Sequence, residues 1–409
     1  MRAIKKEQLE FLDWEMGAFF HFGIRTFYEG HTDWDMKEMP LEGFCPTELD
    51  CEQWIRTVKE AGCKYAILVC KHHDGFANWP SAYTEYSVAN TPWKDGKGDV
   101  VREYTDACRK YGIKVGLYYS PAQFGSNRME SKEYDDYFIN QISELLTNYG
   151  KIDYLWFDGC GSEDHKYDTE RIVKEIRRMQ PNILIFNIWD PDTRWVGNEA
   201  GLVQMPNYNT VDALQVSVLT TRKEELEEKR FLPSECDCRI RLDNWFYSDS
   251  DSETLKSVEE LLGLYYYSVG KGANLLLNIG PDRRGLLPDK DAARFVEFGK
   301  KVQEMFSQPL TNIETFEQVD QTYTIKLNEE NLLNHVILEE NIDMENYVEK
   351  FSVYVYPHCY GKRILVYQGT TIGHKHICMF PTVNTGKVEI VIEQERGKHS
   401  MKDIRLYYC

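Results

Sequence analysis

The sequence lacks the features by which membrane-bound and secreted proteins are recognised. No stretch approaches the roughly 18 consecutive apolar residues that a membrane-spanning helix needs. The N-terminal stretch MRAIKKEQLEFLDWEMGAFF carries acidic side chains where a secretory signal would need an unbroken apolar run. We therefore expect no membrane partner and a cytoplasmic location.

Positive charge and nucleotide-binding motifs are also scarce. The chain has 48 lysine and arginine residues against 66 aspartate and glutamate residues, a formal net charge of -18. Because phosphate backbones are bound by clustered cations, nucleic acid is excluded as a partner. No G-x-G-x-x-G follows the first apolar run, and no G-x-x-x-x-G-K-[ST] occurs. We expect no cofactor.

The 11 cysteines form no recognisable disulfide or zinc pattern. Their number is odd, and Cys63, Cys70 and Cys108 lie in apolar segments, where a reduced cysteine behaves as a small hydrophobe. The closest pair, Cys236 and Cys238, is C-x-C without a second pair at zinc-site spacing. We interpret them as reduced thiols and predict no structural metal.

What the sequence does contain is enough apolar material for two domains. Its 409 residues are 42% hydrophobic, which is typical of large buried cores. Up to about Phe306, short apolar runs alternate with amphipathic helical stretches, the rhythm of parallel β-α units. The apolar runs are GAFFHFGI, KYAILVC, IKVGLYYS, IDYLWFDG, NILIFNI, a less certain one ending near FLPSE, and NLLLNIG.

This rhythm predicts an α/β fold, a (β/α)8-like TIM barrel over residues 1–307. After Phe306 the helical period fades and strands with alternating polarity follow, such as QTYTIKLN, NHVILEE, FSVYVYPH and KVEIVIEQ. They predict a C-terminal β-sandwich over residues 308–409, with the boundary near Pro309. We expect the sandwich to have a structural or interface role, and the sequence predicts no oligomeric state.

Polar side chains gather where the predicted barrel strands end. In such barrels the active site lies at the carboxyl ends of the strands. Each such side chain, taken singly, can be interpreted as a hydrogen-bonded core group. Together they favour a neutral polyol ligand, whose hydroxyls need hydrogen bonds and whose apolar face stacks on aromatic rings. The residues are His21, Lys71, His72, His73, Asp74, Tyr118, Tyr119, Ser120, Asp158, Asn187, Asp190 and Glu235.

Asp158 is the most informative carboxylate, because it follows the apolar run YLWF, where burying a charge without partners is costly. Retaining glycoside hydrolysis requires a second carboxyl about 5 to 5.5 Å from the first. Glu199, in the glycine-flanked loop RWVGNEAG, and Glu235, in PSECD, are the two candidates. The residues alone leave the choice between them open.

The segment His72-His73-Asp74 also has a reading as a metal cluster, since histidine and aspartate bind transition metals. Neighbouring residues near a strand end point in opposing directions, so we expect the two histidines not to bind one ion together. The helical spacing of H-E-x-x-H is missing as well. The sequence therefore predicts no catalytic metal.

Several segments, in this order, resemble glycoside hydrolase family 29, the α-L-fucosidases, between about Met16 and Phe306. They are FFHFG with Trp34 soon after, KHHDGFANWPS, DACRKYGIKVGLYYSP, LLTNYGKIDYLWFDG, RWVGNEAG and SVGKGANLLLNIGPDRRG. The resemblance implies a retaining, metal-independent hydrolase of terminal α-L-fucosyl residues on a (β/α)-barrel followed by a β-sandwich. A fucosylated oligosaccharide or glycoconjugate is the implied substrate.

The resemblance also implies roles for single residues. Asp158 is the implied nucleophile, which forms a covalent fucosyl-enzyme intermediate. Trp245 is an implied aromatic contact near the sugar or its neighbour. The implied fucose pocket consists of His21, Trp34, His72, His73 and Tyr119, with Tyr118 as the alternative to Tyr119.

RWVGNEAG and the pattern ECDxxIRxxxWFY resemble the subgroup that cleaves α-1,3- and α-1,4-linked fucose from branched, Lewis-type glycans. This favours Glu199 as the acid/base, with Glu235 as a substrate contact and reserve candidate. The charged stretch VLTTRKEELEEKR and the extra residues beside WFY in DCRIRLDNWFYSDSD depart from that pattern. Three alternatives stay open: a metal-dependent hydrolase, a carbohydrate-binding protein without catalysis, and a hydrolase of another deoxy sugar or a galactoside.

Overall fold

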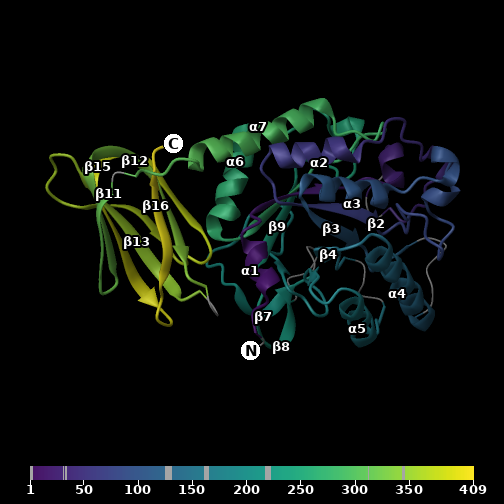
Figure 1. Ribbon diagram of the computed structural model, residues 1–409, viewed down its shortest axis with the longest axis horizontal. Helices are drawn as coiled ribbons and strands as arrows, with labels where there is room; N and C mark the ends of the chain where they lie inside the picture. The colour runs from purple at the N-terminus through teal and green to yellow at the C-terminus, as the bar shows by residue number, and fades with distance from the viewer. Residues whose placement is uncertain are drawn as a thin grey trace.

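The computed structural model describes residues 3–30, 32, 35–124, 131–160, 165–216, 223–311, 313–342 and 346–409. A helix-covered barrel and a separate group of long strands lie side by side, with the strands at the C-terminal end of the chain (Figure 1).

Eight parallel strands form the barrel, in the order β5-β4-β3-β2-β1-β10-β9-β6. An isolated bridge between Phe186 and Thr193 joins the two ends of this order, so the sheet closes on itself. The strands are β1 Met16–Phe20, β2 Tyr65–Lys71, β3 Lys114–Tyr119, β4 Tyr154–Phe157, β5 Leu184–Ile185, β6 Arg194–Trp195, β9 Ser234–Arg239 and β10 Asn274–Asn278.

Two apolar cores lie on the two faces of this sheet. Side chains that point inward, among them Phe19, Tyr118 and Trp156, fill the barrel interior. Those that point outward, such as Leu117 and Tyr119, pack under the surrounding helices. Because both faces are buried, the strands are continuously apolar, as parallel strands usually are.

The helices cover the outside of the barrel (Figure 1). Four of them, α2, α3, α5 and α6, begin at a residue whose side chain caps the first turn. Asp50 and Asp99 accept hydrogen bonds from backbone amides in the first turns of α2 and α3, which satisfies donors that lack a partner within the helix. The helices are α1 Lys6–Leu12, α2 Cys51–Glu60, α3 Val100–Tyr111, α4 Ser131–Asn148, α5 Thr169–Met179, α6 Val258–Tyr267 and α7 Asp289–Phe306. Within the described part of the chain, no helix is both long enough and apolar enough to span a bilayer.

The sixth expected strand is displaced in the structure. Phe231 is the last residue of strand β8 (Lys223–Phe231), and Leu232 follows it. Strand β8 pairs antiparallel with β7 (Thr210–Gln215) outside the barrel. Pro233 separates it from the barrel strand β9, which begins at Ser234 rather than ending near Glu235. The short strand β6 falls in a segment that the sequence analysis treats as a loop.

The C-terminal strands form one antiparallel sheet with an apolar core of its own. Its strands are β11 Ile313–Val319, β12 Thr322–Glu340, β13 Val348–Pro357, β14 Ile364–Gly369, β15 His376–Glu395 and β16 Met401–Tyr407. The segments QTYTIKLN and NHVILEE, expected as two strands, form the single strand β12, which pairs with β15 across two irregularities of register. A TIM-like barrel followed by an antiparallel β domain is thus confirmed.

The β domain contacts the barrel through polar side chains near α6. The Tyr266 hydroxyl lies 2.7 Å from Nε2 of His335, and the Lys271 ammonium lies 3.0 Å from Nε2 of His376. Burial lowers the pKa of His335 to about 4, so the contact between Tyr266 and His335 joins two neutral side chains near pH 7.

Candidate active site

A cavity of about 240 Å³ opens at the carboxyl ends of the barrel strands, where barrels of this type carry their active sites. Aromatic rings, imidazoles and carboxyl groups share its wall, a composition that suits a sugar. Its lining consists of Phe19, His21, His72, His73, Tyr118, Trp156, Asp158, Gly159, Cys160, Phe186, Asn187, Trp195, Glu199, Val216, Asp237, Arg239 and Trp245.

Asp158 follows β4 directly and presents its carboxylate to the cavity between fixed donors. The Tyr118 hydroxyl donates to Oδ2 at 2.8 Å, and the Cys160 amide donates to Oδ1 at 2.8 Å. Burial raises the pKa of Asp158, whereas these two hydrogen bonds lower it, because they favour the ionised form. The carboxylate is oriented by its neighbours and keeps 23% of its side-chain surface exposed.

His73 places a proton acceptor beside this carboxylate. Ser120 Oγ donates its only proton to the Ala122 carbonyl at 2.9 Å, so it accepts from Nδ1 of His73 at 2.6 Å. Burial lowers the pKa of His73 to about 3, and the neutral ring therefore carries its proton on Nδ1. Its Nε2 lies 3.6 Å from Oδ2 of Asp158 and, being unprotonated, acts as an acceptor.

His21 is fixed in a similar way at the end of β1. Asn278 donates through Nδ2 to the Trp245 carbonyl at 2.8 Å, so its Oδ1 accepts from Nδ1 of His21 at 2.8 Å. Burial lowers the pKa of His21 to about 3. The His21 and Trp245 rings lie 4.9 Å apart, and together they form one side of the cavity.

Glu199 reaches the cavity from the loop that follows β6. Gly197 and Gly201, with φ of 92° and 72°, adopt the left-handed turns that bracket this loop, a conformation that glycine tolerates best. Burial raises the pKa of Glu199, the Asp158 charge raises it further, and Arg239 and a hydrogen-bonding contact with Trp245 lower it. Asp158 and Glu199 therefore share one cavity in unlike environments.

Comparison with known proteins assigns the family. The sequence model of the Alpha-L-fucosidase family matches residues 2–304. The chain belongs to the α-L-fucosidase family. It is a glycoside hydrolase with a TIM-like barrel and a β domain.

Relatives resemble this fucosidase along nearly its whole length. α-L-Fucosidase 1 of Arabidopsis thaliana is 30% identical over 97% of this chain and 86% of its own. The crystal structure of a putative α-L-fucosidase from Bacteroides ovatus has a TM-score of 0.89 and 36% identity, over 99% of this chain and 74% of its own. A Ruminococcus gnavus fucosidase in complex with fucose has a TM-score of 0.85 and 25% identity, over 99% and 94%.

Tyr118, not Tyr119, belongs to the fucosidase cavity, which corrects the implied pocket. Tyr119 is fully buried under α4, where its hydroxyl donates to Gln141 Oε1 at 2.7 Å. Successive side chains of a strand point to opposite faces, so only one of the two tyrosines faces the barrel interior. Trp34 lies outside the described residues, and its implied role stays a prediction.

Glu235 does not line the cavity, contrary to its expected role as a substrate contact or reserve acid/base. It lies fully buried beneath the Trp156 ring and accepts hydrogen bonds from Tyr65, Trp156 and Tyr154 at 2.6, 2.9 and 3.3 Å. Burial raises its pKa to about 7. In the layered interior of a barrel, Glu235 occupies the layer below Asp237.

The adjacent histidines both face the cavity of the fucosidase, which contradicts the expectation that they point apart. They lie beyond the last residue of β2, where strand alternation no longer applies, and their ring centroids are 4.2 Å apart. Potential ligand atoms of His72, His73 and Asp158 lie within 4.8 Å of one another. Asp74 instead pairs with buried Arg25 at 3.0 Å. The absence of a catalytic metal stays a prediction.

Four further cavity residues are not predicted from the sequence: Asp237, Arg239, Trp156 and Trp195. Asp237 accepts a hydrogen bond from the Trp195 indole at 2.6 Å, and burial raises its pKa well above the usual range. Alternation along β9 carries the missing signal, because residues 235, 237 and 239 share one face. That face is recognisable only once β9 is known to begin at Ser234.

Proposed function

We propose that this fucosidase removes terminal α-L-fucosyl residues with retention, using Asp158 as the nucleophile and Glu199 as the acid/base. The observation that carries the proposal is the oriented carboxylate of Asp158, held by Tyr118 and the Cys160 amide at the cavity wall. A nucleophile must be ionised and aimed at the anomeric carbon, and fixed donors supply both conditions.

In the first step, Glu199 donates its proton to the glycosidic oxygen while Asp158 attacks the anomeric carbon. The leaving sugar departs as an alcohol, and an ester joins fucose to Asp158. That ester has no charge, so the repulsion that raises the pKa of Glu199 disappears. The pKa of Glu199 then falls, so Glu199 stays ionised and can act as the base of the second step. It takes a proton from water while the water oxygen attacks the anomeric carbon and Asp158 leaves as a carboxylate.

The remaining cavity residues suit the sugar itself. Nε2 of His73 is an acceptor for a fucose hydroxyl, and neutral His21 and His72 add further hydrogen-bonding nitrogens without bringing a positive charge. The Trp156 and Trp245 rings line the cavity and offer apolar surface to a pyranose. The Ruminococcus gnavus relative in complex with fucose supports this assignment.

The proposal extends to α-1,3- and α-1,4-linked fucose on branched, Lewis-type oligosaccharides. Its support is the sequence pattern around RWVGNEAG and ECDxxIRxxxWFY, together with the contribution of both segments to the cavity through Glu199, Asp237 and Arg239. The expected cytoplasmic location and the lack of a cofactor stay predictions.

The test measures fucose release from a Lewis-type trisaccharide and from 4-nitrophenyl α-L-fucoside, for the wild type, Asp158→Ala and Asp153→Ala. Asp153 lies just before β4, at the opposite end from Asp158, and binds the Val115 amide away from the cavity, so its variant controls for general damage. We expect loss of activity in Asp158→Ala alone, with partial rescue by azide. Activity retained in Asp158→Ala would refute the assignment, and preference for the simple fucoside would refute the linkage.

A further inference from the structure

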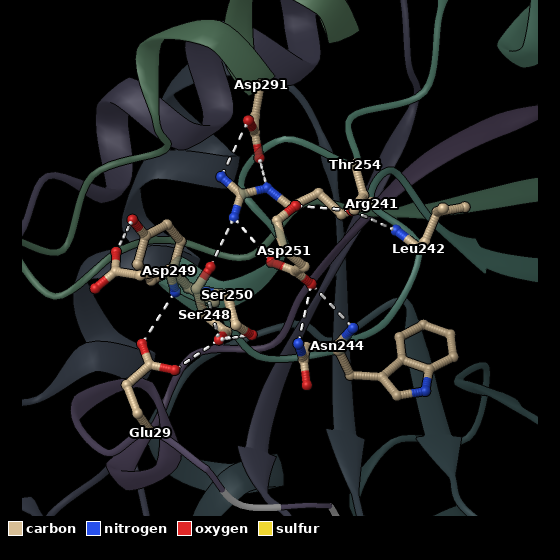
Figure 2. A network of polar contacts seen from close by, with 12 residues as sticks. Glu29, Arg241, Leu242, Asn244, Ser248, Asp249, Ser250, Asp251, Thr254 and Asp291 are labelled. Atoms are coloured by element: carbon tan, nitrogen blue, oxygen red, sulfur yellow. Dashed lines mark hydrogen bonds and ion pairs between the residues drawn. The ribbon is translucent and has the colours of Figure 1, made fainter.

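The loop between β9 and α6 brings Trp245 to the cavity, and a buried arginine organises it. Figure 2 shows Arg241 between two carboxylates that come from different segments. Its Nε donates to Asp291 Oδ2 at 2.7 Å, and its Nη1 donates to Asp251 Oδ1 at 3.1 Å and to the Ser248 carbonyl at 3.0 Å. Asp291 lies in the first turn of α7, so the arginine anchors the loop to the helical layer.

Asp251 extends this anchor to the residue before Trp245. Its Oδ2 accepts from both the amide and the side-chain Nδ2 of Asn244, each at 3.1 Å, as the dashed lines of Figure 2 show. One carboxylate therefore uses one oxygen for Arg241 and the other for Asn244. Asn244 is held through its backbone, which limits where the next side chain lies.

The carbonyl of Trp245 has an anchor as well. It accepts from Asn278 on β10, whose other side-chain atom binds His21. The backbone around Trp245 is thus held on both sides: Asp251 binds the preceding residue, Asn244, and Asn278 of the barrel binds the Trp245 carbonyl. Its ring stands 5.1 Å from the Arg239 guanidinium. Trp245 and Glu199 line the same cavity, and Trp245 lowers the pKa of the Glu199 carboxyl.

Stability alone is a weak reason for burying three charges. Desolvation offsets much of the attraction between buried ions, and apolar replacements of similar volume are often as stable. A guanidinium with several fixed donors instead enforces one geometry. The network is therefore suited to fixing the position of the loop between β9 and α6.

We propose that Arg241 and Asp251 are positioning residues for fucose hydrolysis, which hold Trp245 against Glu199 and against the bound sugar. The inference rests on the proposed role of Glu199. Arg241 and Asp251 line no part of the cavity; they act through Asn244 and Trp245, while Asp291 supplies the countercharge that keeps Arg241 in place.

The charged and titratable groups around Glu199 predict a specific pH signature. Burial and the Asp158 charge oppose the ionised form of Glu199, whereas Arg239 and Trp245 favour it. Asp237 is close enough for the Glu199 charge to raise its pKa. When the loop shifts, Glu199 loses the Trp245 contact, so its pKa rises. Because Glu199 must be protonated for the first step, the basic limb of the kcat/KM profile moves to higher pH. A fold-wide loss of stability would not move that limb.

The test compares Asp251→Asn with a control variant that removes a different contact to the same loop. Arg283, on the segment between β10 and α7, pairs with Asp249 of that loop at 2.7 Å and also with Glu29. Arg283→Gln removes these exposed ion pairs and leaves the Asp251 contacts with Asn244 in place. We expect Asp251→Asn to lower kcat/KM about tenfold and to move the basic limb upward, while Arg283→Gln leaves both unchanged. An unmoved basic limb in folded Asp251→Asn would overturn the proposal.

A double-mutant cycle identifies the route of the effect. If Asp251 acts through Trp245, then Asp251→Asn in a Trp245→Phe background costs less than about twofold, since the second change has nothing left to displace. A full tenfold loss in that background would overturn the proposal. If Asp251→Asn does not fold, Asn244→Ala takes its place, because it keeps the buried ions paired and removes only the Nδ2 hydrogen bond to Asp251. We expect this variant to lower kcat/KM about threefold. An unchanged kcat/KM would overturn the proposal.

Binding of free fucose separates this inference from the proposed function. Calorimetric titration needs no turnover, and we expect Asp251→Asn to weaken fucose binding severalfold relative to Arg283→Gln. A wild type that binds fucose but releases none would contradict the proposed catalytic roles while leaving the positioning role measurable. Equal affinities in the two variants would overturn the positioning role.

Discussion

Replacing Tyr118 with phenylalanine tests whether Asp158 works as an ionised carboxylate. The change removes the hydroxyl that donates to Oδ2 at 2.8 Å and leaves the ring, which packs 5.4 Å from Trp156 and 5.6 Å from His72 between centroids. Tyr119→Phe is the matched control, because the neighbouring hydroxyl donates to Gln141 under the helices.

The magnitude follows from the type of hydrogen bond. A bond to a charged group contributes about 1.5–3 kcal/mol, and about 1.4 kcal/mol corresponds to a tenfold change in a protonation equilibrium. The Tyr118 hydroxyl lowers the pKa of Asp158, so its loss raises that pKa. Since the nucleophile must be ionised, the acidic limb of kcat/KM should move upward by about one pH unit or more.

The assay is kcat/KM for 4-nitrophenyl α-L-fucoside over roughly pH 3 to 9, a range that brackets both limbs. We expect the shifted acidic limb in Tyr118→Phe and the wild-type profile in Tyr119→Phe. An unshifted limb in folded Tyr118→Phe, or equal shifts in the two variants, would contradict the reasoning that Asp158 is held ionised by this hydroxyl.

Three further outcomes are expected. Burial raises the pKa of Glu235 to about 7, so the folded state binds more protons than the unfolded state between about pH 4.5 and 7. The stability of the wild type therefore falls as the pH rises through this range. Thermal unfolding of Glu235→Gln should lack this dependence on pH, and the variant should keep most of its kcat/KM. Asp237→Asn, which preserves a polar group beside Trp195, should retain far more activity than Asp237→Leu. Overnight chelation should leave kcat unchanged, although His72, His73 and Asp158 lie within metal-binding reach; loss restored by Zn²⁺ would refute the metal-independent mechanism.

The barrel is predictable from sequence because its strands are short apolar runs separated by capped helices. The same continuous apolarity hides which way each side chain faces. Leu117, Tyr118 and Tyr119 are all buried, so no polar alternation reveals that Tyr118 alone of the pair points inward. Parallel strands covered on both faces therefore give the positions of site residues along the chain but not their faces.

The acid residues differ in predictability for a related reason. Asp158 is found readily, because a carboxylate directly after YLWF stands out against the apolar run. Glu235 is misassigned, since the apolar residues Phe231 and Leu232 mark the end of an outer hairpin and not of a barrel strand. The tertiary context of Pro233 decides where β9 begins, and that context is not local in sequence.

The two proposed catalytic carboxyls differ in how they are held, and this difference bears on their chemistry. Asp158 stands at a strand end with two fixed donors, so its orientation belongs to the barrel. Glu199 stands on a glycine-bracketed loop, and its surroundings depend on Arg239 and on Trp245 from the neighbouring loop. The nucleophile is thus set by the barrel itself, whereas the acid/base is set by two loops, one of which Arg241 fixes from outside the cavity. Substitutions in those loops should therefore alter the basic limb of the pH profile more readily than the acidic limb.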